Sequence, residues 1–128
     1  MKLLLDTHTL LWFLTNDRSL STQARAAIEA GGNLCSVSAA SLWEVAVKVA
    51  LSKLTLPAPY ADIFPRQLEI NGFGLLPITP THCAALLTLP LHHRDPFDRL
   101  LLAQAQSEAM TLVSDDGQFA PYGVPVLW

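Results

Sequence analysis

The stretch MKLLLDTHTLLWFL, residues 1–14, contains the change of pattern that decides the fold. Three consecutive leucines, Leu3 to Leu5, form a short apolar run that is typical of a strand buried on both faces. Asp6 follows at once, and residues Thr7 to Leu14 then have the pattern of a helix. A buried strand that leads directly into a helix is typical of a parallel α/β sheet.

The same alternation continues along the rest of the chain. Short apolar runs predict further strands, and the stretches between them predict helices. We expect strands over residues 33–37, 74–78, 111–113 and 124–127, and helices over 21–30, 38–54, 60–70, 80–87 and 96–108. Strands separated by helices imply crossover units, so the sequence predicts an α/β fold with a mainly parallel central sheet covered on both faces.

The composition predicts one domain over residues 1–128. The chain is 51% hydrophobic and 15% charged, which suffices for one core and excludes a disordered chain. The first residues imitate a signal peptide, but Asp6 and His8 interrupt the apolar run, and no stretch reaches the ~20 apolar residues of a membrane span. We therefore expect a soluble, cytoplasmic protein. Cys35 and Cys83 lack the spacing of a zinc site or redox pair and are expected to be small core side chains.

Carboxylates stand where two predicted strands end. Asp6 follows the first strand directly, and Asp115 and Asp116 follow the strand at 111–113 in the same manner. In open parallel sheets the ligand crevice lies beyond the carboxyl ends of the strands, so these positions suggest a function. Each also has a purely structural explanation, since Asp6 suits a helix N-cap and the Asp pair before Gly117 suits a turn.

Two further acids lie on predicted helices. Asp98 lies one turn into the helix at 96–108, where Asp95 suits the N-cap. Glu44 belongs to a narrow polar stripe on an otherwise apolar and therefore largely buried helix, together with Ser41, Lys48 and Ser52. Such a stripe must face a cleft or a thin strip of solvent. The alternative for Glu44 is a plain surface pair with Lys48.

Taken together, Asp6, Glu44, Asp98 and Asp116 can meet at the carboxyl edge of the sheet. Unpaired carboxylates clustered there would repel one another and titrate abnormally. A hard divalent cation removes that repulsion, because Mg²⁺ or Mn²⁺ takes oxygen ligands and retains several waters. Such an ion polarises a phosphoryl oxygen and activates a water as nucleophile. The cluster therefore predicts metal-assisted chemistry on a phosphate ester.

Four ordered motifs resemble those of the PIN-domain ribonucleases, in particular the VapC-type toxins of bacterial toxin–antitoxin pairs. They are LLDTH at 4–8, SAASLWEVAVK at 38–48, HRDPFDRL at 93–100 and LVSDDGQF at 112–119. The resemblance covers residues 1–128 and implies a three-layer α/β/α domain. It further implies a Mg²⁺- or Mn²⁺-dependent endoribonuclease that forms a homodimer and is held inactive by a cognate antitoxin protein.

The resemblance also implies roles for the acids. Asp6, Glu44 and Asp98 match the three core acids of the family, and Asp116 matches the less constant fourth. Asp6 and Asp98 would hold the principal ion, while Glu44 and Asp116 would position a second ion or the attacking water. The adjacent Asp115 leaves open which of the two neighbouring acids faces the metal.

Supporting roles are expected for neighbouring polar residues. Thr7, with His8, would support the carboxylates by hydrogen bonding, and Ser114 precedes the fourth acid as in the family motif. The expected phosphate contacts, each of which could equally be a surface partner of a nearby acid, are Lys48, Arg94 and Arg99. The spacing of His82, His92 and His93 matches no standard metal site, so packed or solvated imidazoles are expected there. Ser52 stands where the related segment often has glycine, which affects a helix end but no ligand.

The net charge of −3 predicts no general attraction to nucleic acid. RNA binding would therefore be local, metal-dependent and assisted by a dimer groove. One alternative is a metal-dependent phosphatase of small phosphoesters, although residue 8 is His where the haloacid-dehalogenase type usually has Asp. A phosphate-receiver domain fits less well, because such domains require a pair of acidic residues early in the chain. A further alternative is a non-catalytic PIN-like module that docks a partner through Trp12 and Phe13.

Overall fold

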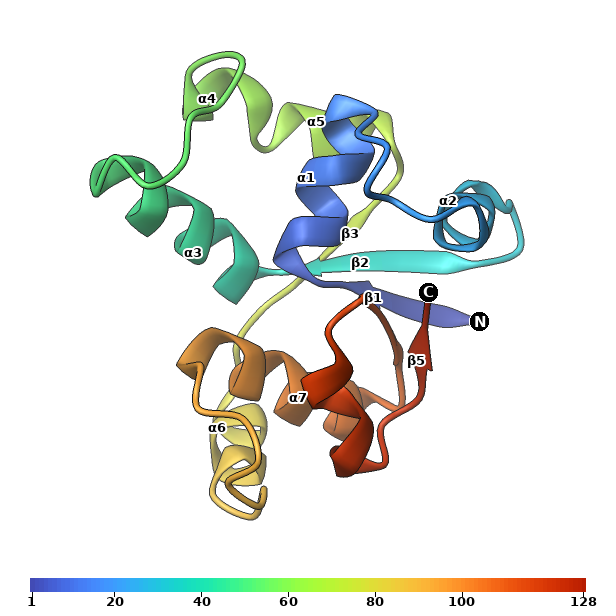
Figure 1. Ribbon diagram of the computed structural model, residues 1–128, viewed down its shortest axis with the longest axis vertical. Helices are drawn as coiled ribbons and strands as arrows, with labels where there is room; N and C mark the ends of the chain where they lie inside the picture. Colours follow the sequence, from blue (N-terminus) through green and yellow to red (C-terminus); the bar gives the residue numbers. More distant parts are fainter.

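The fold is built on a five-stranded sheet in which every neighbouring pair of strands is parallel. The computed structural model describes residues 1–128 and is shown in Figure 1. The strand order is β3-β2-β1-β4-β5. The strands span Lys2–Leu5 (β1), Leu34–Ser38 (β2), Gly74–Leu76 (β3), Thr111–Val113 (β4) and Val126–Leu127 (β5). The strand that opens the chain is therefore the central one, and its carboxyl end lies between those of β2 and β4.

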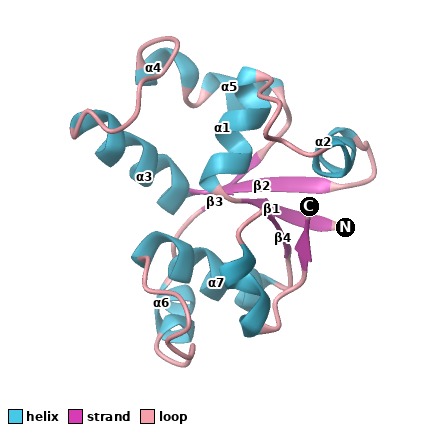
Figure 2. Cartoon of the chain, in the orientation of Figure 1, coloured by secondary structure: helices cyan, strands magenta, loops and turns pink.

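Helices cover both faces of this sheet, as the sequence predicts. Figures 1 and 2 show α1 to α5 on one side of the sheet and α6, α7 and the 3-10 helix η1 on the other. Their bounds are Thr7–Thr15 (α1), Thr22–Glu29 (α2), Ala39–Ala50 (α3), Tyr60–Ile63 (α4), Arg66–Ile70 (α5), Pro80–Leu86 (α6), Pro96–Glu108 (α7) and Gly117–Tyr122 (η1). The expected three-layer α/β/α architecture is confirmed. None of the helices is both long and apolar enough to cross a membrane.

Strand β1 supplies side chains to a separate hydrophobic core on each face of the sheet. Leu3 and Leu5 belong to the core under α1 and α2, whereas Leu4 points the other way and packs with residues of α7 and η1. All three are completely buried. Successive side chains of a strand point to opposite faces, so three consecutive leucines serve a sheet that is covered on both sides.

Two helices differ by more than one residue from their predicted bounds. The predicted helix at 60–70 is two short helices, α4 and α5, because Pro65 lies between them and has no backbone N–H with which to continue the first. The predicted helix at 38–54 ends at Ala50, and Ser52 then adopts a left-handed conformation with φ 56°. Glycine adopts that conformation readily, which is consistent with the glycine often found at this place in the motif.

Some apolar side chains that the sequence places in the core are exposed. Cys35 is buried as predicted, but Cys83 is exposed on α6. Trp43 on α3 is 63% exposed, and its ring meets that of Phe97 edge-on at 5.4 Å between centroids. The expectation that the apolar residues of α3 are largely buried is therefore wrong for Trp43. One apolar side of α3 packs on the core and another is exposed to solvent. The number of apolar residues in the helix does not tell these two sides apart.

Helix α7 ends at Ala109, which adopts a left-handed conformation with φ 52° and whose backbone N–H donates to Ala105 and Gln106. A left-handed residue with a Cβ is strained, and this side chain is exposed. We expect Ala109→Gly to raise the free energy of unfolding by about 1 kcal/mol. The matched control is Ala26→Gly at an exposed position inside α2, which should lower it by about 1 kcal/mol. Urea titration measures both, and equal effects would show that the conformation of residue 109 is not strained.

Candidate metal centre

A cleft of about 440 Å³ opens at the carboxyl ends of β1 and β4. The four acids singled out from the sequence all line it, although up to 110 residues separate them along the chain. The full lining is Asp6, Thr7, His8, Trp12, Glu44, Lys48, Asp95, Asp98, Asp115, Asp116 and Gly117. Six of these side chains are carboxylates, and Lys48 is the one Lys or Arg among them. The cleft is therefore strongly anionic.

Asp6 reaches the cleft from the junction of β1 and α1. Its side chain caps α1 by accepting the Thr9 backbone N–H at 2.7 Å, so the structural explanation offered by the sequence also applies. The residue is only 6% exposed. Burial raises the pKa of Asp6 above its ordinary value, and hydrogen bonds from Ser114 and Thr9 oppose this in part. The nearby His8 also favours the ionised form of Asp6, but burial has the larger effect.

Glu44 reaches the cleft from α3 and is fixed at both oxygens. The Thr7 hydroxyl donates to Oε1 at 2.6 Å, and Lys48 Nζ lies 2.7 Å from Oε2. The predicted pair with Lys48 exists, but Glu44 is 4% exposed and is no surface residue. Of the predicted polar stripe, Glu44 and Lys48 line the cleft and Ser41 and Ser52 do not. Thr7 supports a carboxylate as expected.

Asp98 enters from the first turn of α7. Asp95 caps this helix by accepting the backbone N–H groups of Phe97 and Asp98, as predicted. Burial and the neighbouring Asp95 charge raise the pKa of Asp98 to about 7, and Glu44 and Asp116 add to the effect while His93 opposes it. Near neutral pH this carboxyl is about half protonated. A divalent cation in the cleft would favour its ionised form.

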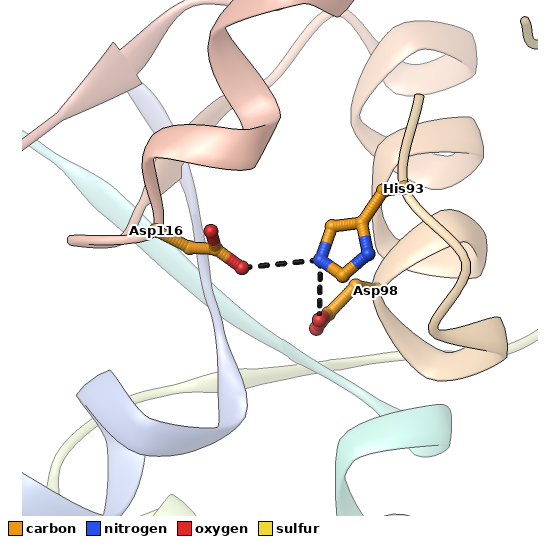
Figure 3. Close-up of side chains that lie close together, drawn as sticks. All are labelled: His93, Asp98 and Asp116. Atoms are coloured by element: carbon orange, nitrogen blue, oxygen red, sulfur yellow. Dashed lines mark hydrogen bonds and ion pairs between the residues drawn. The ribbon is translucent and has the colours of Figure 1, made fainter. Parts of the chain in front are cut away.

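Asp116 follows β4 and caps η1 by accepting the Gln118 backbone N–H. Its Oδ2 lies 3.1 Å from Nε2 of His93, and the same nitrogen lies 2.9 Å from Asp98 Oδ2 (Figure 3). Asp115 is exposed and also lines the cleft. Of the two neighbouring acids, Asp116 is the one in contact with this cluster. Ser114 is buried and accepts the Asp116 backbone N–H at 3.0 Å.

His93 is a packed residue, one of the two environments expected from the sequence, but its contacts with the carboxylates were not predicted. Its ring is buried and lies between two of the carboxylates (Figure 3). The only sequence signal for this location was the position of His93 five residues before Asp98. His82 is a packed residue as expected: its ring accepts the Thr79 backbone N–H in the capping box of α6 and contacts Glu108 at 2.9 Å. His92 is exposed.

The predicted phosphate contacts fall into two groups. Lys48 lines the cleft beside Glu44. Arg99 does not line it, because its guanidinium donates to backbone carbonyls at the end of α6 and in the segment that follows, those of Leu86, Leu89, Pro90 and His93. Arg94 is exposed and is also absent from the cleft lining. A phosphate contact near the carboxylates is therefore favoured for Lys48 but not for the two arginines.

The donor set of the cleft fits a hard divalent cation. Ligand atoms of Asp98, Asp116 and His93 lie within 4.8 Å of one another, and the buried carboxyls of Asp6 and Asp98 have raised pKa values. Carboxylate oxygens are the ligands that Mg²⁺ and Mn²⁺ prefer. The carboxylates that could hold an ion are Asp6, Glu44, Asp98 and Asp116.

Comparison with known proteins identifies a family and a similar protein. The family model described as the PIN domain matches residues 3–124. The chain is 31% identical over 124 residues to the ribonuclease VapC22 of Mycobacterium tuberculosis (strain ATCC 25618 / H37Rv), and the match covers 95% of this chain and 92% of that protein.

Solved structures share the fold at low sequence identity. A chain of VapBC2 from Rickettsia felis, bound to a DNA fragment from its promoter, superimposes with a TM-score of 0.73 at 15% identity, covering 98% of this chain and 96% of that one. A chain of VapBC-1 from nontypeable Haemophilus influenzae gives a TM-score of 0.66 at 14% identity, with coverage of 98% and 96%. At such identities the similarity establishes the architecture alone.

Proposed function

The chain belongs to the PIN-domain family, and from that membership and the anionic cleft we propose that it is a divalent-metal-dependent endoribonuclease, the toxin of a toxin–antitoxin pair. The observation that carries the proposal is the meeting of Asp6, Glu44, Asp98 and Asp116 in one cleft with a single lysine among them. The 31% identical relative is a ribonuclease, which supports RNA as the substrate. We further propose that the 128 residues form one PIN domain.

In this proposal Asp6 and Asp98 hold the principal Mg²⁺ or Mn²⁺ ion. Such an ion, when bound, polarises a phosphoryl oxygen and makes a water acidic enough to act as nucleophile. Glu44 and Asp116 position a second ion or the attacking water. Thr7 keeps Glu44 oriented through the 2.6 Å hydrogen bond, and Ser114 keeps the backbone of Asp116 in place.

Lys48 is the proposed contact for the phosphate backbone. Its ammonium group lies at the cleft with about a third of the side chain exposed, so it can turn from Glu44 toward an entering phosphate. The chain as a whole has a net charge of −3 and offers no broad basic surface by composition. Substrate binding is therefore proposed to depend on the metal and on this local contact.

The proposed protein partners are a cognate antitoxin and a second copy of the chain. The structural neighbours include VapBC complexes, which supports a toxin–antitoxin assembly. An apolar groove lined by Trp43, Cys83, Leu86, Pro96, Phe97 and Leu100 supports self-association, because exposed apolar patches on soluble proteins mark contact surfaces.

The test of the proposal is cleavage of RNA that depends on a divalent ion. Purified protein is incubated with structured RNAs in Mn²⁺, in Mg²⁺ and in EDTA, and the products are separated on denaturing gels. We expect cleavage with either ion, none in EDTA, and recovery when Mn²⁺ is added in excess over the chelator. DNA of the same sequence and p-nitrophenyl phosphate are the comparison substrates.

The alternatives give different results in the same experiment. Release of phosphate from p-nitrophenyl phosphate without RNA cleavage would identify a phosphatase. RNA or protein binding without turnover in any ion would identify a non-catalytic module. RNA cleavage that persists in EDTA would contradict the metal-dependent mechanism.

A further inference from the structure

His93 makes two contacts that the proposed mechanism does not use. It lies in the segment between α6 and α7, five residues before Asp98 and 23 before Asp116. Its Nε2 is 2.9 Å from Asp98 Oδ2 and 3.1 Å from Asp116 Oδ2 (Figure 3). Those two carboxylates come from different elements, α7 and the segment after β4. A single ring nitrogen therefore links two acids of the proposed metal site.

The other ring nitrogen determines which role Nε2 can take. The Asp95 backbone N–H donates to His93 Nδ1 at 3.2 Å, so Nδ1 presents a lone pair. In a neutral imidazole the proton then resides on Nε2, which acts as a donor toward both carboxylates. Ligation of a metal through Nε2 would require the proton to be on Nδ1. The Nδ1–H would then face the Asp95 backbone N–H, and two donors would lie opposite each other. The geometry thus favours a hydrogen-bond donor over a nitrogen ligand.

The ring is also fixed by its surroundings. The backbone N–H of His93 donates to the Tyr122 hydroxyl at 2.6 Å, and its carbonyl accepts from Arg99 at 3.4 Å. The ring centroid lies 5.8 Å from that of Phe119, which is fully buried. The side chain of His93 is 7% exposed. A donor this constrained sets the positions of its acceptors.

We propose that His93 is a positioning residue, which sets the separation of Asp98 and Asp116 by donating its Nε2–H to both carboxylates and does not itself ligate the ion. This inference rests on the proposed function, because it concerns the acids assigned to the metal. His93 joins α7 to the start of η1 and so holds the two sides of the cleft together.

The first test measures Mn²⁺ binding directly, by isothermal titration calorimetry on the full chain without RNA. We expect His93→Ala to weaken Mn²⁺ binding about 10- to 100-fold, as loss of a group that orients metal ligands does. We expect His93→Gln to recover most of that loss, since its amide N–H donates from nearly the place of Nε2. The matched control is His92→Ala, which removes the exposed neighbouring imidazole and should leave binding unchanged. Circular dichroism establishes that each variant is folded.

The second test identifies the proton-bearing nitrogen of His93. Long-range ¹H–¹⁵N correlation spectra distinguish a ring protonated at Nε2 from one protonated at Nδ1. We expect the Nε2-protonated form both before and after addition of diamagnetic Mg²⁺. Transfer of the proton to Nδ1 on Mg²⁺ addition would overturn the inference in favour of direct ligation.

The outcomes separate this inference from the proposed function. If the unsubstituted protein does not bind Mn²⁺, the proposed function fails and the role of His93 fails with it. If the unsubstituted protein binds Mn²⁺, Asp98→Asn does not, and His93→Ala binds it equally well, the role of His93 alone is wrong. If His93→Gln binds as weakly as His93→Ala in folded protein, the imidazole is a ligand and the inference is also wrong.

Discussion

Replacing Asp6 with asparagine is expected to reduce RNA cleavage by about a thousandfold or more while leaving the protein folded. Asparagine keeps an oxygen that can accept the Thr9 backbone N–H, and it is as good an N-cap as aspartate. What it loses is the negative charge and the affinity of a carboxylate for Mg²⁺ or Mn²⁺. The substitution therefore separates the structural role of Asp6 from its proposed role at the metal.

The measurement is the initial rate of RNA cleavage in saturating Mn²⁺, together with the thermal unfolding midpoint of the same sample. The matched control is Asp17→Asn, because Asp17 is exposed and accepts one backbone N–H, that of Ser19. The control should cleave RNA at the unsubstituted rate. Undiminished cleavage by folded Asp6→Asn would remove Asp6 from the mechanism, and with it the assignment of the principal ion.

Replacing Asp98 with asparagine is expected to stabilise the metal-free protein by about 3 kcal/mol at pH 8. Burial and the surrounding acids raise the pKa of Asp98 from its ordinary 3.8 to about 7. At ~1.4 kcal/mol for each pH unit, that rise corresponds to about 4 kcal/mol. Because 24% of the side chain is exposed, solvent screening reduces the expected effect to about 3 kcal/mol.

The pH dependence follows from the sign of this shift. The folded state holds the proton of Asp98 more tightly than the unfolded state does, so the stability of the metal-free protein falls as pH rises from about 4 to about 7. Below pH 4 the carboxyl is protonated in both states, and the advantage of asparagine disappears there. The same Asp98→Asn change should abolish Mn²⁺ binding, so a gain in stability accompanies a loss of function.

The measurement is urea unfolding in EDTA at pH 4.5 and pH 8, for the unsubstituted protein and Asp98→Asn. The control is Asp62→Asn, which changes an acid on α4 away from the cleft and should give no pH-dependent difference. Equal stabilities of Asp98→Asn and the unsubstituted protein at pH 8 would show that the Asp98 carboxylate is not destabilised in the absence of metal.

The layers of the fold were predictable because local patterns coincide with the tertiary environment. Leu3 and Leu5 point to one face of the sheet and Leu4 points to the other, so β1 is apolar on both faces. Only a sheet that is covered on both sides requires such a strand. The bounds of α7 agree with the prediction because Asp95 and Pro96 are a start signal whose geometry is local. Where a boundary depended on the conformation of a single residue, as at Ser52, the helical pattern continued past the true end.

The acids of the site were predictable for a related reason. Parallel strands bring their carboxyl ends to one edge of the sheet, so Asp6 and Asp116 were expected to approach each other, and the structure brings both to the cleft. Their roles in binding a metal stay a prediction. The contacts of His93 and Arg99 were not predictable, because both depend on the path of the irregular segment between α6 and α7. The exposure of Trp43 likewise depends on which side of α3 meets a neighbour.

The central position of β1 has a consequence for synthesis of the protein. β1 pairs with β4, whose residues follow it by more than a hundred positions, and Asp6 meets Asp116 only when that pairing exists. A nascent chain that has not yet exposed Asp116 has neither the last carboxylate nor the strand that carries it into place. The cleft therefore cannot be complete until β4 and the segment after it have been synthesised and β4 has paired with β1.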